Sequence, residues 1–155
     1  MPALDLPFGS QVLIELHVPD FQLAYDFYKL FGFELQWMED RYMVLRRGEQ
    51  ALCFYGGHED VSSQRHFRKF PSSTPRGYGV EILLFVDKVE DLYKQVAGAI
   101  SISSPLDMRP WGRKDFRAVD PFGYYLRISE PYNIVIDDRK KIETCEVVAK
   151  KSFKI

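Results

Sequence analysis

Residues 12–32 read VLIELHVPDFQLAYDFYKLFG, and residues 80–98 repeat the same order of features as VEILLFVDKVEDLYKQVAG. Each stretch begins with apolar residues typical of a strand, and in the first stretch they alternate with polar ones. It then passes through an aspartate into an apolar helix that ends at a glycine. A shift of 68 residues superimposes Leu16 on Leu84 and Tyr25 on Tyr93. The repeat therefore predicts two similar modules, and paired architectures of this kind place their sites at the seam between the modules.

Three further strands are predicted after each helix, at residues 33–38, 42–47 and 50–55 and at residues 100–105, 114–119 and 124–129. We expect one α+β domain over residues 1–155, built from two tandem β-α-β-β-β modules. Its parts are a first module at 10–56, a connecting loop at 57–78, a second module at 79–130 and a C-terminal extension at 131–155. The pattern of residues 142–148 fits either a strand or a short helix.

The composition points to a globular protein that binds small molecules. Apolar residues make up 46% of the chain, with 12 Phe and 9 Tyr, so a core can form without disulfides. A net charge of -1 argues against a nucleic-acid partner, which normally requires a basic excess. Cys53 and Cys145 are interpreted as two reduced thiols. We expect a cytoplasmic protein without a membrane partner, because neither a secretory signal nor a long apolar span is present.

Two segments carry a resemblance to a known superfamily: DFQLAYDFYKLFGFEL at residues 20–35 and RPWGRKDFRAVDPFGYYLRI at residues 109–128. They resemble the vicinal oxygen chelate superfamily of glyoxalase I, extradiol dioxygenases, fosfomycin-resistance enzymes and bleomycin-resistance proteins. The Pro-Trp-Gly and Asp-Pro-x-Gly motifs of the second segment resemble the bleomycin-resistance branch, where that loop and strand help to form a drug-binding groove. Over about residues 10–130, the resemblance implies modules that curl into an open barrel around a cavity, commonly in a homodimer.

Metal-using members of that superfamily hold their ion on the first and last strands of the modules. The resemblance places those positions here at Leu13, Leu52, Glu81 and Arg127. Leucine has no donor atom, and Arg127 carries a fixed positive charge with no lone pair to offer. We therefore predict no resident metal, no other cofactor and no catalytic residue of the usual type. A relocated divalent site made by Glu15, His17 and Glu81 is the alternative.

The same alternation predicts which side chains face the cavity, because the face opposite the helices must line it. The predicted ligand-binding residues are Glu15, His17, Trp37, Phe54, Glu81, Phe85, Arg109, Trp111, Phe116, Tyr125 and Arg127. Glu81 and Arg127 are expected to form an ion pair across the cavity floor, in a structural or a functional role. Trp111 is either a stacking surface for a planar ligand or a cover for the edge of the core. Cys53 is expected on the helix-facing side of its strand, and His58 and His66 are read as ordinary loop residues.

Three functions agree with these observations. The first is a metal-free protein of the bleomycin-resistance type, which sequesters a small aromatic or charged molecule in a cavity shared by two subunits. The second is a metal-dependent lyase, isomerase or dioxygenase of the same superfamily with a displaced metal site. The third is an interaction module whose long loop or C-terminal extension contacts a protein partner.

Overall fold

The computed structural model describes residues 12–57 and 59–135 of the chain. These residues divide into two compact units, each with its own sheet. The first unit holds the described residues up to Tyr78 together with the turn Asp120–Gly123, and the second holds 79–119 and 124–135. His58, Cys145 and the part of the predicted C-terminal extension from residue 136 onward lie outside the described residues.

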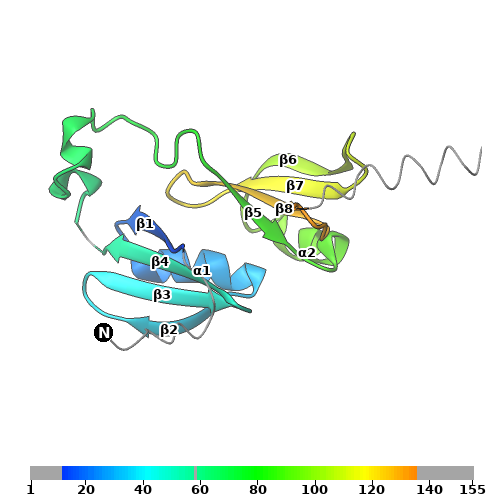
Figure 1. The fold of residues 1–155 in the computed structure, drawn as a ribbon, viewed down its shortest axis with the longest axis horizontal. Coiled ribbons are helices and arrows are strands. Elements are labelled where there is room, and N and C mark those ends of the chain that lie inside the picture. Colours follow the sequence, from blue (N-terminus) through cyan, green and yellow to red (C-terminus); the bar gives the residue numbers. More distant parts are fainter. Residues whose placement is uncertain (1–11, 58, 136–155) are drawn as a thin grey trace, which may run out of the picture. The chain divides into compact units, whose positions relative to one another are not determined.

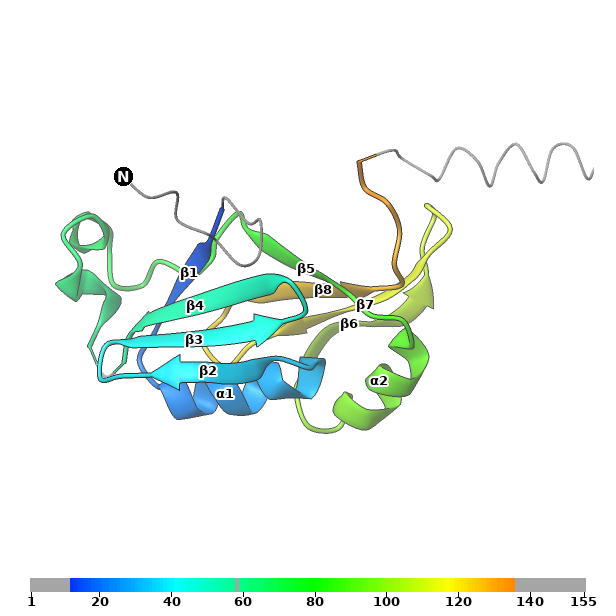
Figure 2. The same ribbon diagram turned by 60° about the horizontal axis from the view of Figure 1, so that its bottom comes forward.

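The first unit is a β-α-β-β-β module (Figure 1). Its elements are β1 (Ile14–Val18), α1 (Phe21–Tyr28), β2 (Glu34–Met38), β3 (Tyr42–Arg47) and β4 (Gln50–Gly56). The strands form sheet A in the order β1-β4-β3-β2, with β1 parallel to β4 and the other pairs antiparallel. Figure 2 shows α1 along one face of this sheet.

The second unit repeats the module. Its elements are β5 (Glu81–Phe85), α2 (Val89–Val96), β6 (Ser101–Met108), β7 (Lys114–Val119) and β8 (Tyr125–Ser129). They form sheet B in the order β5-β8-β7-β6, again with one parallel pair, β5 and β8. The predicted α+β class and the two tandem β-α-β-β-β modules are confirmed. In the first unit, residues 59–78 follow β4 and contain two short 3-10 helices, η2 (Val61–Ser63) and η3 (Phe67–Lys69).

The first helix begins and ends as its sequence predicts. The backbone N–H of Leu23 donates to Oδ1 of Asp20 at 2.9 Å, which caps the first turn. After a single 3-10 turn at Lys29–Phe31, Gly32 adopts a φ of 85°, a left-handed conformation that glycine accepts without strain.

The second helix differs from its prediction at the N-terminus. Asp87 is the aspartate that precedes this helix, but the residue at the cap is Lys88, which makes no side-chain capping bond. Glu90 and Asp91 instead lie in the first turn of α2, where their negative charges favour the positive end of the helix dipole. The helix still forms because Val89 and Val96 are buried against sheet B.

Each sheet buries the face that its own helix covers. In the first unit the rings of Tyr28 and Phe54 lie 5.2 Å apart, and Tyr28 donates from its hydroxyl to Oδ2 of Asp120 at 3.1 Å. In the second unit the rings of Tyr93 on α2 and Phe116 on β7 lie 5.1 Å apart. The remaining core residues of the two faces are Leu16, Val18, Met43, Leu45, Leu52, Leu84, Ala118, Leu126 and Ile128. In the described part of the chain, no helix is long and apolar enough to cross a membrane.

Candidate functional site

The opposite side of each sheet, here called its open face, carries the polar and aromatic residues. Because side chains alternate along a strand, the pairing register assigns each residue to a face. The open face of sheet A carries Glu15, His17, Trp37, Tyr42, Cys53 and Tyr55. The open face of sheet B carries Glu81, Leu83, Phe85, Asp115, Arg117, Tyr125 and Arg127.

Two predicted site residues lie on the wrong side for that role. Phe54 is fully buried against Tyr28 of α1, and Phe116 is fully buried against Tyr93 of α2. Both therefore belong to the core rather than to an open face, and their predicted placement is wrong. The same shift of one residue in β4 turns Leu52 toward the core and Cys53 toward the open face, contrary to the expectation for Cys53.

The register also corrects the comparison between the two modules. Glu15 pairs with Cys53, and Leu83 pairs with Arg127. Under the 68-residue shift Glu15 corresponds to Leu83, so the counterpart of Arg127 in the first module is Cys53 and not Leu52. Cys53 is a buried free thiol.

On sheet A, the open face combines one carboxylate with a stacked aromatic pair. The hydroxyl of Tyr42 donates to Oε1 of Glu15. The ring of Tyr42 stacks on that of Trp37, with centroids 5.4 Å apart and planes inclined by 23°. Burial, assisted by the hydrogen bond to Glu15, raises the pKa of Tyr42 far above its ordinary value. Tyr42 therefore stays protonated and keeps Glu15 oriented.

The side chain of His17 is fixed by contacts within the protein. Its Nε2 donates to the backbone carbonyl oxygen of Glu59 at 2.9 Å, and its ring meets Tyr55 edge to face at 5.3 Å. The side chain is almost completely buried, and burial followed by the positive charge of Arg76 lowers the pKa of His17. Since a protein carbonyl occupies Nε2, that nitrogen does not face a ligand in this arrangement.

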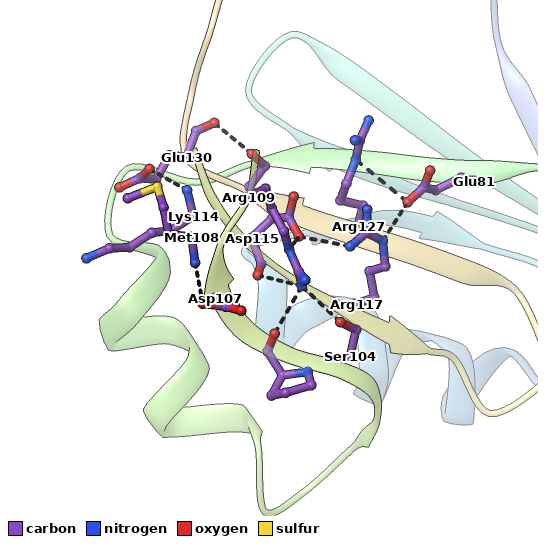
Figure 3. Close-up of polar contacts among 12 residues, drawn as sticks. Glu81, Ser104, Asp107, Met108, Arg109, Lys114, Asp115, Arg117, Arg127 and Glu130 are labelled. Atoms are coloured by element: carbon purple, nitrogen blue, oxygen red, sulfur yellow. Dashed lines mark hydrogen bonds and ion pairs between the residues drawn. The ribbon is translucent and has the colours of Figure 1, made fainter. Parts of the chain in front are cut away.

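On sheet B, five charged side chains form one connected group, the arginine cluster, which consists of Arg109, Arg117, Arg127, Asp115 and Glu81 (Figure 3). The predicted ion pair is present: Nε of Arg127 lies 3.6 Å from Oε1 of Glu81. Arg117 also reaches this oxygen, with 3.4 Å between its Nε and Oε1 of Glu81. One carboxylate oxygen therefore serves two arginines.

Arg109, a predicted ligand-binding residue, uses its guanidinium group for hydrogen bonds within the protein. Its Nε donates to Oδ1 of Asp115 at 2.6 Å. Its Nη2 donates to Oγ of Ser104 at 2.9 Å and to the carbonyl oxygens of Pro105 and Asp115 at 3.1 and 3.2 Å. These bonds tie β6 to β7, so Arg109 holds the cluster together and offers little to a ligand.

Trp111 lies at the tip of the hairpin that joins β6 and β7. The turn is closed by Arg109 N–H to the Arg113 carbonyl and by Gly112 N–H to the Arg109 carbonyl, each at 2.9 Å. The indole ring covers Arg127 and Arg117, whose guanidinium carbons lie 5.8 and 6.0 Å from its centroid. Both distances fit a cation–π contact, so Trp111 packs against the arginine cluster.

Arg117 and Asp115 were missed by the sequence reading, which named Phe116 on the same strand. Side chains alternate along β7, so either Phe116 or its two neighbours face the open side of the sheet. A register difference of one residue exchanges these two possibilities. The charge pattern of β7 could have decided the face. In a strand segment that reads Asp-Phe-Arg, the phenylalanine is normally buried and the two charged residues face the other side.

The sequence itself matches a known family. The profile of the Glyoxalase/Bleomycin resistance protein/Dioxygenase superfamily matches residues 11–128. The chain belongs to this superfamily. No curated protein has a sequence that matches the chain significantly.

Several solved structures share the fold of this chain. TioX from Micromonospora sp. ML1 superimposes with a TM-score of 0.61 at 21% identity, covering 79% of this chain and 98% of that one. A bleomycin resistance determinant encoded on the transposon Tn5 gives 0.56 at 22% identity, over 81% and 100% of the two chains. A bleomycin-binding protein complexed with bleomycin gives 0.53 at 21% identity, over 80% and 100%. At these identities the similarity concerns the fold.

The residues of this superfamily member do not suit the metal of its metal-using relatives. Of the positions carried across, Leu13 offers only hydrocarbon, Leu52 faces the core, and Glu81 is already shared by two guanidinium groups. Cys53, which takes the place of Leu52 once the register is corrected, is a buried thiol. A divalent cation beside Arg127 would be repelled by a charge that cannot be released. Within residues 12–57 and 59–135, no three His, Cys, Asp or Glu side chains are grouped closely enough to hold a metal ion.

Proposed function

We propose that this superfamily member is a binding protein that sequesters a small aromatic or charged molecule without using a metal. The observation that supports the proposal is the Glu81–Arg127 ion pair, 3.6 Å long, lying beside the indole of Trp111. A guanidinium group thus stands where metal-using relatives are expected to place a ligand. Sequestration requires only a surface that is complementary to the ligand. The guanidinium group and the neighbouring indole ring provide such a surface.

The physical character of the open faces supports binding over catalysis. Each open face pairs an indole with charged groups: Trp37 with Glu15 through Tyr42 in the first unit, and Trp111 with the arginine cluster in the second. Large flat rings bury much area at low entropy cost, and nearby charges select for orientation. A neighbour of the same fold is known in complex with bleomycin, a further reason to propose small-molecule capture here. The homodimer and the shared cavity remain predictions.

A thermal-shift screen of aromatic cations, anions and neutral compounds tests the proposal. A ligand at about 100 times its Kd adds about 2.7 kcal/mol to the free energy of unfolding, which is readily visible for a domain of this size. Hits should also change the fluorescence of the protein's two tryptophans. If no compound stabilises the protein in a broad screen, the proposal fails.

Metal analysis of protein purified without chelators tests the competing metal-dependent lyase, isomerase or dioxygenase. The proposal predicts substoichiometric metal in wild type and the same content in Glu81→Gln. One equivalent of Fe, Mn, Ni or Zn in wild type that is lost in Glu81→Gln would contradict the metal-free proposal and favour the enzyme.

A further inference from the structure

Resting on the proposed function, we propose that the open face of sheet B is a receptor for an oxyanion. Arg117 and Arg127 bind the carboxylate of an aromatic acid, and Trp111 receives its ring. The ligand of the protein is therefore an aromatic carboxylate rather than a cation, and the arginine cluster selects it by charge.

The first argument is the balance of charge in the arginine cluster. Three guanidinium groups face two carboxylates, Asp115 and Glu81. Arg109 neutralises Asp115 through the shortest of these contacts, 2.6 Å from its Nε to Oδ1 of Asp115. Arg117 also reaches Asp115, with 3.1 Å between its Nη1 and Oδ1, and it shares Glu81 with Arg127. The three guanidinium groups therefore exceed the two carboxylates of the cluster by one positive charge.

The second argument is the quality of the contacts that Glu81 makes. Charge-assisted N–H···O bonds are typically about 2.7–2.9 Å long. The two nitrogens that approach Oε1 of Glu81 lie 3.4 and 3.6 Å away, and both approach the same oxygen. Within the described residues, Nε of Arg127 is buried and donates no hydrogen bond. Glu81 therefore pairs with these arginines only weakly and leaves their positive charges poorly satisfied.

The third argument is the burial of Arg117 and Arg127, which strengthens the interaction of their guanidinium groups with an anion. Their side chains are 17% and 20% exposed, for Arg117 and Arg127 respectively. In such surroundings an unsatisfied guanidinium is unfavourable, and an ionic hydrogen bond is stronger than at an exposed site. Two planar, forked donors also match the paired oxygens of a carboxylate.

Trp111 completes the receptor. Its ring lies over both guanidinium groups, which displaces water from one side of them and restricts their rotamers. Figure 3 shows Arg117 and Arg127 converging on Glu81 while the end of Arg127 points away from the rest of the cluster. An aromatic acid can thus place its carboxylate at the arginines and its ring near the indole.

Isothermal titration with three probes of nearly identical shape tests the inference: naphthoate, its neutral amide naphthamide, and the cationic naphthylmethylamine. The receptor predicts that naphthoate binds about 10-fold or more tighter than the other two probes. Arg127→Met should weaken naphthoate binding about 10- to 100-fold, since an ionic hydrogen-bond donor is lost. Lys94→Met, which removes one positive charge from the outer surface of α2 in the same unit, should leave the affinity unchanged.

Arg127→Lys serves as a second variant, because it keeps the charge if the methionine variant fails to fold. Its affinity for naphthoate should lie between those of wild type and Arg127→Met, because a single ammonium group cannot offer the paired N–H donors of a guanidinium group. Equal affinities for naphthamide and naphthoate would overturn the inference. Equal losses of naphthoate affinity in Arg127→Met and Lys94→Met would overturn it as well. If naphthoate does not bind but neutral or cationic compounds from the wider screen do, the receptor is wrong and the proposed function stands. If nothing binds in either experiment, both fail.

Discussion

The guanidinium group of Arg109 donates from Nε to Oδ1 of Asp115 across 2.6 Å, and the Asp115 side chain is completely buried. Arg117 donates to the same oxygen from Nη1 at 3.1 Å. A buried carboxylate with two arginine partners is an anchor for the strands that carry them. It joins the β6–β7 hairpin, with Trp111 at its tip, to the open face of sheet B.

Replacing Asp115 by Ala should therefore be severely destabilising. The variant leaves Arg109 and Arg117 without their shared partner, and removing one member of a buried ion pair typically costs about 3–5 kcal/mol. Urea unfolding measures this loss. Asp107→Ala is the matched control, because Asp107 lies on the same hairpin but is exposed, and it should cost less than about 1 kcal/mol. Similar losses in the two variants would show that Asp115 is not an anchor.

Gly56 and Gly123 allow a steric prediction with an internal control. Their φ angles are nearly the same, 108° and 105°, so alanine is strained equally at both positions. A Cβ at Gly56 would collide with Nε2 of His17 and lie 2.5 Å from its Cδ2, whereas a Cβ at Gly123 meets nothing within 4 Å. Gly56→Ala should thus destabilise the protein by about 1–3 kcal/mol more than Gly123→Ala. Equal free energies of unfolding for the two variants would contradict the close packing of His17.

His17 should make stability depend on pH in the mildly acidic range. Burial, and secondarily the charge of Arg76, lower the pKa of His17 below its ordinary value of 6.5. The unfolded chain then binds a proton more readily than the folded one. The contribution of His17 is fully present above pH 6.5 and is lost as the pH falls from there through the lower pKa of the folded state.

Urea unfolding of wild type and His17→Gln between about pH 8 and pH 5 measures this contribution. The glutamine amide can still donate to the Glu59 carbonyl but does not titrate in this range. Wild type should lose more stability than His17→Gln as the pH is lowered. Parallel curves would mean that the pKa of His17 is not lowered by folding.

The sequence predicted the fold because its two modules repeat strong local signals. In β1 apolar and polar residues alternate, which places Glu15 on the open face correctly, and Glu81 lies on the corresponding face of β5. The capping aspartate of α1 and the terminal glycine are equally local, and both behave as predicted. Such features depend only on residues that are neighbours in the chain.

The faces of β4 and β7 were harder to predict. All four residues of Ala51–Phe54 are apolar, so alternation gives no signal there. Aligning the hairpin glycines Gly48 and Gly123 places Leu52 at the position of Arg127 and turns Leu52 and Phe54 toward the open face. The first hairpin pairs Arg47 with Gln50, while the second pairs Val119 with Tyr125 across a longer turn. Because a shift of one residue reverses the face, this difference was enough to misplace Phe54. The tie between Arg109 and Asp115 spans a turn whose geometry the sequence does not specify.

Fluorescence titration of two single-tryptophan variants with a hit from the thermal-shift screen tests the central claim most directly. Trp37→Phe leaves only Trp111, and Trp111→Phe leaves only Trp37. A ligand bound at the open face of sheet B should produce a saturable change in Trp37→Phe, with the affinity found for wild type by calorimetry. It should bind more weakly to Trp111→Phe. A hit that leaves the emission of Trp111 unchanged and binds Trp111→Phe as tightly as wild type would place the site elsewhere and contradict the account.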